Sequence, residues 1–163
     1  MAQAPPRLDL VSGEIVCSDL TKDDVGDPTV LPDLLDQVAG PVSRFLAHGA
    51  YDGDPTSDLL AARFGSLIEV TIPPPKKAIR SPDAAKEPRA RDRHIAEIAA
   101  HGRMAWQKAT GYDQRSRGET LMGRWKAIIG PKLKARNFKN QKTEANIGVW
   151  FLNRMTGVGR PSF

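Results

Sequence analysis

Four residues in the C-terminal half have the types and spacing to act on a polyanion. Arg115, Glu119, Met122 and Lys126 follow one another at intervals of four, three and four residues, which places them on one face of a helix. A carboxylate between two cations on such a face has two interpretations. It forms ion pairs with its neighbours on a solvated helix, or it binds a metal ion while the cations bind phosphates. The spacing alone leaves both interpretations open.

Charge is distributed unevenly along the chain. Residues 1–60 contain 3 basic and 11 acidic side chains, a net charge of −8, whereas residues 61–163 contain 21 basic and 8 acidic ones, a net charge of +13. Between Arg103 and Lys142, 11 basic residues are accompanied only by Asp113 and Glu119. This excess indicates either a polyanionic partner or a solvated basic surface.

The composition excludes several classes of protein. The 163 residues are 40% hydrophobic and 26% charged, which suits about one globular domain. No apolar run reaches the length of about 18 residues that a membrane span needs, and residues 1–6 do not read as a signal peptide. The single cysteine, Cys17, excludes an internal disulfide and a cysteine-based zinc site, and it fits a cytoplasmic location.

Hydrophobic periodicity predicts an α/β domain over residues 7–163 with a helical C-terminal part. We expect a β-hairpin over 7–20, in which Ser12 and Gly13 form the turn, and two further strands. A basic, mobile surface loop is expected at 76–89, after three consecutive prolines that end a strand. The other expected strands are 42–47 and 67–72, and the expected helices are 31–38, 57–64, 91–109, 115–129 and 143–155.

Tyr112 extends the candidate stripe into a longer pattern. Tyr112, Arg115, Glu119 and Lys126 read Tyr-x2-Arg-x3-Glu-x6-Lys, which resembles the signature of DDE transposases of bacterial insertion sequences, in the IS-four/IS-five-like group. The segments Gly49-Ala50-Tyr51-Asp52-Gly53 and Leu152-Asn153-Arg154-Met155 also resemble that family. The resemblance extends from about residue 7 to the C-terminus.

The resemblance implies an RNase H-like fold that cleaves and joins DNA at transposon ends. In that family two aspartates and one glutamate hold two Mg²⁺ or Mn²⁺ ions, and Glu119 stands in the place of the glutamate. Arg115 and Lys126 would hold the DNA backbone beside the scissile phosphate. Tyr112 would pack against the terminal nucleotide or form a hydrogen bond with it.

The chain departs from the family at the two aspartates. His48 stands where the second aspartate is usual, and its neutral nitrogen suits Mg²⁺ poorly. Asp52 or Asp54, on the following turn, could replace the missing ligand. The first aspartate belongs to a central strand upstream of the 7–20 hairpin, so the resemblance implies a truncated fold. The hairpin then supplies the second and third strands, 42–47 the fourth and 67–72 the fifth.

Three functions follow and stay open. The chain is a transposase that is defective by itself, a non-catalytic DNA-binding protein that modulates an intact transposase, or an inert gene remnant. Expected partners are DNA and either full-length transposase or a second copy of the chain, with no membrane. His94 and His101 are expected to be ordinary helix residues. Apolar side chains are expected to pack between helices; they are Trp106, Trp125, Trp150, Leu121, Ile128, Ile147, Phe151 and Met155.

Overall fold

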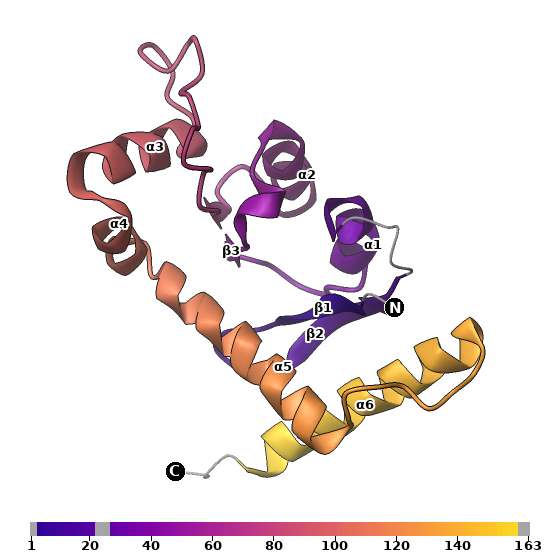
Figure 1. Cartoon of the computed structure of the whole chain (residues 1–163). Coiled ribbons are helices and arrows are strands. Elements are labelled where there is room, and N and C mark those ends of the chain that lie inside the picture. Colours follow the sequence, from indigo (N-terminus) through magenta and orange to yellow (C-terminus); the bar gives the residue numbers. More distant parts are fainter. Residues whose placement is uncertain (1–2, 22–26, 160–163) are drawn as a thin grey trace. The chain divides into compact units, whose positions relative to one another are not determined.

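The computed structural model describes residues 3–21 and 27–159 and shows a mixed α/β protein (Figure 1). Two strands, β1 (Gln3–Leu8) and β2 (Ile15–Leu20), form an antiparallel hairpin. Two others, β3 (Arg44–Leu46) and β4 (Glu69–Thr71), form a parallel pair. The described strands therefore form two separate two-stranded sheets.

Helices make up most of the remaining described chain. The α-helices are α1 (Leu31–Asp36), α2 (Asp54–Phe64), α3 (Ala90–His101), α4 (Arg103–Ala109), α5 (Ser116–Ile128) and α6 (Phe138–Val158). Short 3-10 turns are η1 (Asp27–Val30), η2 (Gly49–Tyr51) and η3 (Tyr112–Arg115). None of the described helices has the length and apolar character needed to cross a membrane.

The chain forms two compact units. The first combines Met1–Ala39 with Ser116–Phe163, and the second is Gly40–Arg115. The first unit therefore contains the hairpin, α1, α5 and α6, whereas the second contains the parallel strand pair, α2, α3 and α4. Each unit is described below by itself.

The first unit is built on the buried face of β2. Alternation along the strand buries Ile15 and Cys17 on the same face, because successive side chains of a strand point to opposite sides. Ile15 packs in one cluster with residues of α5 and α6, and Cys17 packs in another with Val30 and Leu34. The turn before β2 places Gly13 at φ +68°, a conformation that favours glycine.

Helix α6 is attached to the hairpin by packing and by hydrogen bonds. The side chain of Asn153 accepts a 2.7 Å hydrogen bond from the backbone N–H of Ile15 and donates a 2.9 Å hydrogen bond to the carbonyl oxygen of the same residue. The indole of Trp125 on α5 lies directly over Gly148 of α6, where a Cβ would come within 2.6 Å of the ring. The first contact requires the amide of Asn153, and the second requires a residue without a Cβ at position 148. The two contacts therefore determine how α6 packs on β2 and α5.

The second unit is built around the short parallel pair. Phe45 lies opposite Val70, and the N–H of Ala47 donates to the carbonyl oxygen of Thr71 at 3.3 Å. The prolines that begin at Pro73 follow β4 after one residue, Ile72, and the strand ends before them as predicted. No helix or strand is found in the described chain between β4 and α3, which includes the predicted loop 76–89. The mobility of that loop stays a prediction.

Most expected elements are present, although β1 begins at Gln3 rather than at 7 and α2 at Asp54 rather than at 57. Three further corrections apply. The predicted helix 91–109 is two helices, because Gly102 adopts φ +82° and ends α3. Helix α6 begins at Phe138 rather than at 143, because Asn137 caps it by accepting a 2.8 Å hydrogen bond from the N–H of Asn140. The third correction concerns the expected core. Trp106, Trp125 and Leu121 are buried as expected, but the following residues are exposed: Ile128, Ile147, Trp150, Phe151 and Met155.

Candidate nucleic-acid interface

Helix α5 positions two of the predicted site residues. Glu119 lies in its first turn and Lys126 in its last turn, and both side chains are exposed. The opposite face buries Leu121 and Trp125 against the core of the first unit. Seven residues correspond to about 10 Å along a helix axis, so Glu119 and Lys126 share a helix without forming a direct ion pair.

Of the other signature and stripe residues, Met122 also lies on α5, whereas Tyr112 and Arg115 precede this helix. Tyr112 and Arg115 form the first and last residues of η3, which belongs to the second compact unit. The ring of Tyr112 packs against the buried indole of Trp106, with 5.3 Å between ring centroids. The predicted single-helix stripe is therefore wrong for Arg115 alone, which lies on the 3-10 turn directly before α5. The four signature residues are divided between the two units.

His48 has a structural role at the start of η2. Its Nδ1 accepts a 3.2 Å hydrogen bond from the N–H of Ala50, and its ring packs edge-on against the buried ring of Tyr51. His48 therefore caps this turn in the way that serine or aspartate caps a helix.

The two aspartates that could have replaced a missing ligand are bound by arginines. The Nε of Arg91 donates to both carboxylate oxygens of Asp52, at 3.1 and 3.0 Å. Arg89 forms a 2.5 Å ion pair with Asp54. A carboxylate already neutralised by a guanidinium is a poor ligand for a divalent cation.

Neither unit by itself provides a two-metal centre among its described residues. Within each unit, no three His, Cys, Asp or Glu side chains of residues 3–21 and 27–159 come together as a group that could hold a metal ion. Glu119 belongs to the first unit and His48 to the second. The assignment of Glu119 and His48 as catalytic residues, and of Glu119 as a metal ligand, therefore rests on the sequence resemblance, and no reaction step is derived through Mg²⁺ or Mn²⁺.

The strongest concentration of positive charge lies where α5 passes into α6. We call this the basic connection, defined as the exposed side chains of Lys126, Lys132, Lys134, Arg136 and Lys139. Between Thr120 and Thr143 the sequence contains no acidic residue. Within the part of the chain that the structure describes, Lys126, Lys132, Arg136 and Lys139 form no ion pair. Their charges are therefore available to an external anion.

The basic connection is held in place by the start of α6. The carboxylate of Glu144 accepts hydrogen bonds of 2.8 to 2.9 Å from the N–H groups of Lys134 and Ala135. The side chain of Gln141 donates a 2.9 Å hydrogen bond to the carbonyl oxygen of Ala135. These contacts involve the one acidic side chain that the sequence contains after Glu119, so Glu144 orders the connection through its backbone.

The electrostatics of Glu144 agree with this role. The backbone N–H of Lys134, and after it that of Ala135, lowers the pKa of the Glu144 carboxyl below its ordinary value. The positive charge of Lys134 lowers this pKa further. Glu144 is therefore ionised at neutral pH, and its two backbone hydrogen bonds are charge-assisted.

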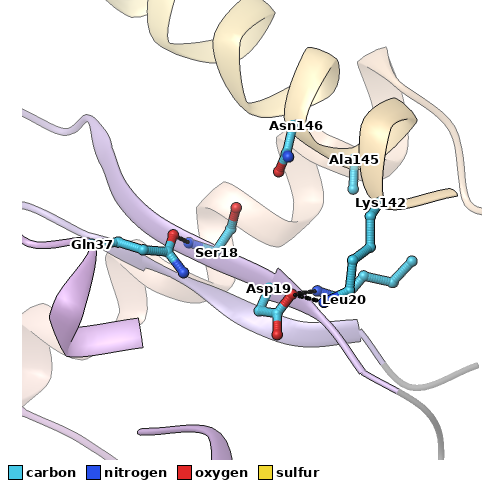
Figure 2. A pocket seen from close by; sticks show the side chains of 7 residues that line it. All are labelled: Ser18, Asp19, Leu20, Gln37, Lys142, Ala145 and Asn146. Atoms are coloured by element: carbon cyan, nitrogen blue, oxygen red, sulfur yellow. Dashed lines mark hydrogen bonds and ion pairs between the residues drawn. The ribbon is translucent and has the colours of Figure 1, made fainter. Parts of the chain in front are cut away.

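A polar pocket of about 260 Å³ lies beside the N-terminal half of α6 (Figure 2). Ser18 on β2 and Asn146 on α6 point toward each other across it. At its edge, Lys142 forms a 2.9 Å ion pair with Asp19. Because these two charges neutralise each other, the pocket attracts neither an anion nor a cation strongly, and the ion pair joins α6 to β2. The lining residues are Ser18, Asp19, Leu20, Gln37, Lys142, Ala145 and Asn146.

Sequence reasoning identified Lys126 but not the other four cations of the basic connection as site residues. The signal was present, because the acid-free stretch from Thr120 to Thr143 is visible in the sequence. What the sequence did not indicate was the pairing of Glu144 with the backbone of the connection. No protein-family model matches this chain, and no solved structure matches it significantly.

Proposed function

We propose that this protein binds DNA through the basic connection and is a non-catalytic relative of the DDE transposases. The observation that carries the DNA-binding proposal is a group of five exposed cations on a stretch without acidic residues, ordered by Glu144. Cations that lack internal ion pairs do not have to break one in order to bind a phosphate. Binding also releases the counterions condensed on the DNA, which favours association.

The transposase relationship is supported by the signature residues and by the pairing of strands. In the RNase H-like order, the first strand lies between the second and the fourth. Without that strand, the second and third remain as an antiparallel hairpin and the fourth and fifth as a parallel pair. The pairs β1–β2 and β3–β4 have these directions and this order along the chain. The agreement supports the proposed truncated RNase H-like fold.

The first experiment measures binding of a fluorescently labelled DNA duplex as a function of salt. We compare the wild-type protein with a triple variant that carries Lys132→Glu, Lys134→Glu and Arg136→Glu. The variant reverses three charges on an exposed connection, so its fold is expected to remain, and circular dichroism checks this. We expect at least a tenfold loss of affinity, since each phosphate contact contributes a salt-dependent share of the binding free energy.

The matched control reverses three charges elsewhere. Lys76, Lys77 and Arg80 are exposed residues of the loop at 76–89, and their replacement by glutamate changes the net charge by the same amount. If binding depends only on the total charge, both triple variants lose affinity equally, and the assignment to the basic connection is wrong. If only the control variant loses affinity, the loop is the binding element instead.

Catalysis by Glu119 is the second candidate, favoured by the four signature residues at the family's spacing. Purified protein is incubated with supercoiled plasmid and Mg²⁺ or Mn²⁺, and nicking is followed on gels. Metal-dependent nicking that disappears in Glu119→Gln would establish a nuclease and contradict the non-catalytic proposal. Because the described residues provide no carboxylate cluster, we expect no nicking with either metal.

A further inference from the structure

Helix α6 has a second apolar face that its own unit does not cover. Ile147, Trp150, Phe151, Met155 and Val158 are exposed by 61, 67, 44, 41 and 74%. They follow the spacing i, i+3, i+4, i+8 and i+11, which places them on one side of a helix. We call this face the α6 stripe.

The stripe differs from the face that α6 buries. The buried side chains of this helix belong to Gln141, Ala145, Gly148 and Leu152, about one third of a turn away around the axis. Along the stripe, the one charged side chain is that of Arg154. Isolated exposed apolar residues are ordinary on a protein surface, but five large ones on adjacent turns are typical of an interaction surface.

We infer that the α6 stripe is the interface of a homodimer, in which the stripes of two copies pack in antiparallel orientation. A helix face with apolar residues at these intervals is complementary to another face of the same kind, which is the property that a two-fold symmetric contact requires. At the observed exposures the five side chains present on the order of 500 Å² per copy. Two copies would bury about 1,000 Å², close to the lower limit for a specific interface.

Charge favours the antiparallel orientation. The basic side chain of Lys139 lies in the first turn of α6, outside the span of the stripe. Parallel packing would place this lysine near the Lys139 of the second copy, whereas antiparallel packing separates the two by the length of the paired helices. An antiparallel pairing centred on the stripe also brings Arg154 opposite the partner's Phe151, where a cation–π contact is favourable.

The test is the mass of the purified full chain by sedimentation over a range of concentrations. We expect a monomer–dimer equilibrium with a Kd on the order of micromolar, as suits a small interface. Trp150→Glu places a charge in the centre of the stripe and should raise the Kd by about tenfold or more. Ala127→Glu is the matched control, since it adds the same charge to an exposed position of helix α5 in the same unit, outside the stripe, and it should leave the Kd unchanged.

Tryptophan fluorescence provides a second measurement that locates the interface. Trp106 and Trp125 are buried in the structure, so Trp150 is the tryptophan that iodide should quench. Quenching should decrease as concentration rises through the dimerisation range. A wild-type chain that is monomeric at every concentration, or a Trp150→Glu variant that dimerises as well as the control, would overturn the inference. Protection of Trp150 in a monomer would also overturn it.

The dimer proposal is independent of DNA binding, and salt separates the two. Higher salt screens repulsion between the basic copies and should strengthen dimerisation, whereas it weakens binding to DNA. Mass that falls to that of the monomer after nuclease treatment would identify DNA-bridged copies and contradict a direct protein contact.

Discussion

The indole N–H of Trp106 donates a 3.0 Å hydrogen bond to Nδ1 of His94, whose Nε2 lies 3.0 Å from the carbonyl oxygen of Val70. Because Nδ1 accepts from the indole, the imidazole proton lies on Nε2 and is donated to Val70. One side chain of α3 thereby connects the fully buried Trp106 of α4 to strand β4. Sequence reasoning treated His94 as an ordinary helix residue and did not predict these two hydrogen bonds.

Replacement of His94 by alanine should destabilise the second unit by about 2–4 kcal/mol. The variant leaves the buried Trp106 N–H and the Val70 carbonyl without a partner and removes the volume of the ring. Urea unfolding monitored by tryptophan fluorescence measures the change. His101→Ala is the control, because His101 is an exposed residue of the same helix with a 3.8 Å contact to Glu97. Equal effects of the two substitutions would refute the role assigned to His94.

Two glycines of α6 should respond oppositely to alanine. At Gly148 a Cβ would lie 2.6 Å from the ring of Trp125, so Gly148→Ala must displace the indole or the helix and should cost about 1–3 kcal/mol. At Gly157 nothing lies within 4 Å of the added atom. Gly157→Ala should therefore stabilise the helix by about 0.5–1 kcal/mol. Thermal unfolding of both variants checks the difference in sign.

Asp92 should make stability depend on pH in the acid range. It is buried and accepts hydrogen bonds from the N–H of Ser81, the hydroxyl of Ser81 and the N–H of Arg89, at 2.7, 2.7 and 3.1 Å. The N–H of Ser81, and after it the Ser81 hydroxyl, lowers the pKa of Asp92 below its ordinary value. Because the folded pKa is the lower one, the stabilisation is present above the unfolded value of about 4. It is lost as the pH falls through the folded pKa.

Asp92→Asn tests this by removing the titration. Unfolding free energies of the two proteins should differ by about 2–3 kcal/mol at neutral pH, since charge-assisted hydrogen bonds are lost. The difference should shrink in acid. A difference that stays constant down to the acid transition would show that Asp92 acts through packing alone.

Glu144 should control the order of the basic connection. Glu144→Gln weakens the hydrogen bonds to the N–H groups of Lys134 and Ala135, so hydrogen exchange at these two amides should accelerate by about tenfold or more. Glu97→Gln is the matched control at another half-exposed helix position. DNA affinity should fall in Glu144→Gln, although the substitution removes a negative charge and raises the net charge of the chain by one. An increase in affinity would mean that charge, and not the ordered shape of the connection, governs binding.

The salt dependence of the DNA-binding constant should report how many phosphates the basic connection contacts. If its five cations all bind phosphates, the logarithm of the association constant should fall with the logarithm of the salt concentration at a slope of about −4 to −5. Single substitutions such as Lys132→Ala should each reduce that slope by about one. A slope near zero would exclude phosphate contacts as the source of affinity.

The local sequence pattern predicted most of the helices and strands. It did not predict boundaries that depend on the backbone conformation or hydrogen bonds of a single residue. The hairpin, the two further strands and the positions of α5 and α6 follow from periodicity and turn residues. The break at Gly102 depends on a positive φ that a glycine permits but does not require. The extension of α6 to Phe138 depends on a cap at Asn137, in a stretch that lacks strong apolar periodicity.

The apolar faces of α6 show the same limit. Ile147, Phe151 and Met155 have the spacing of a core stripe, and so do Ala145, Gly148 and Leu152. Periodicity cannot choose between two faces of one helix. The choice depends on Trp125, which fits over the bare backbone of Gly148, and on Asn153, which binds the backbone of β2.

The sequence by itself determined the charge asymmetry, the mixed α/β class, the order of the elements and the acid-free stretch, because each depends on residue type and local spacing. Only the tertiary structure decided which partners the charged groups take. It pairs Asp52 with Arg91, Asp54 with Arg89 and Glu144 with the backbone of the basic connection. These pairings join residues separated along the chain, and hydrogen bonding falls off steeply with distance and angle. Spacing along one strand or helix therefore could not reveal them.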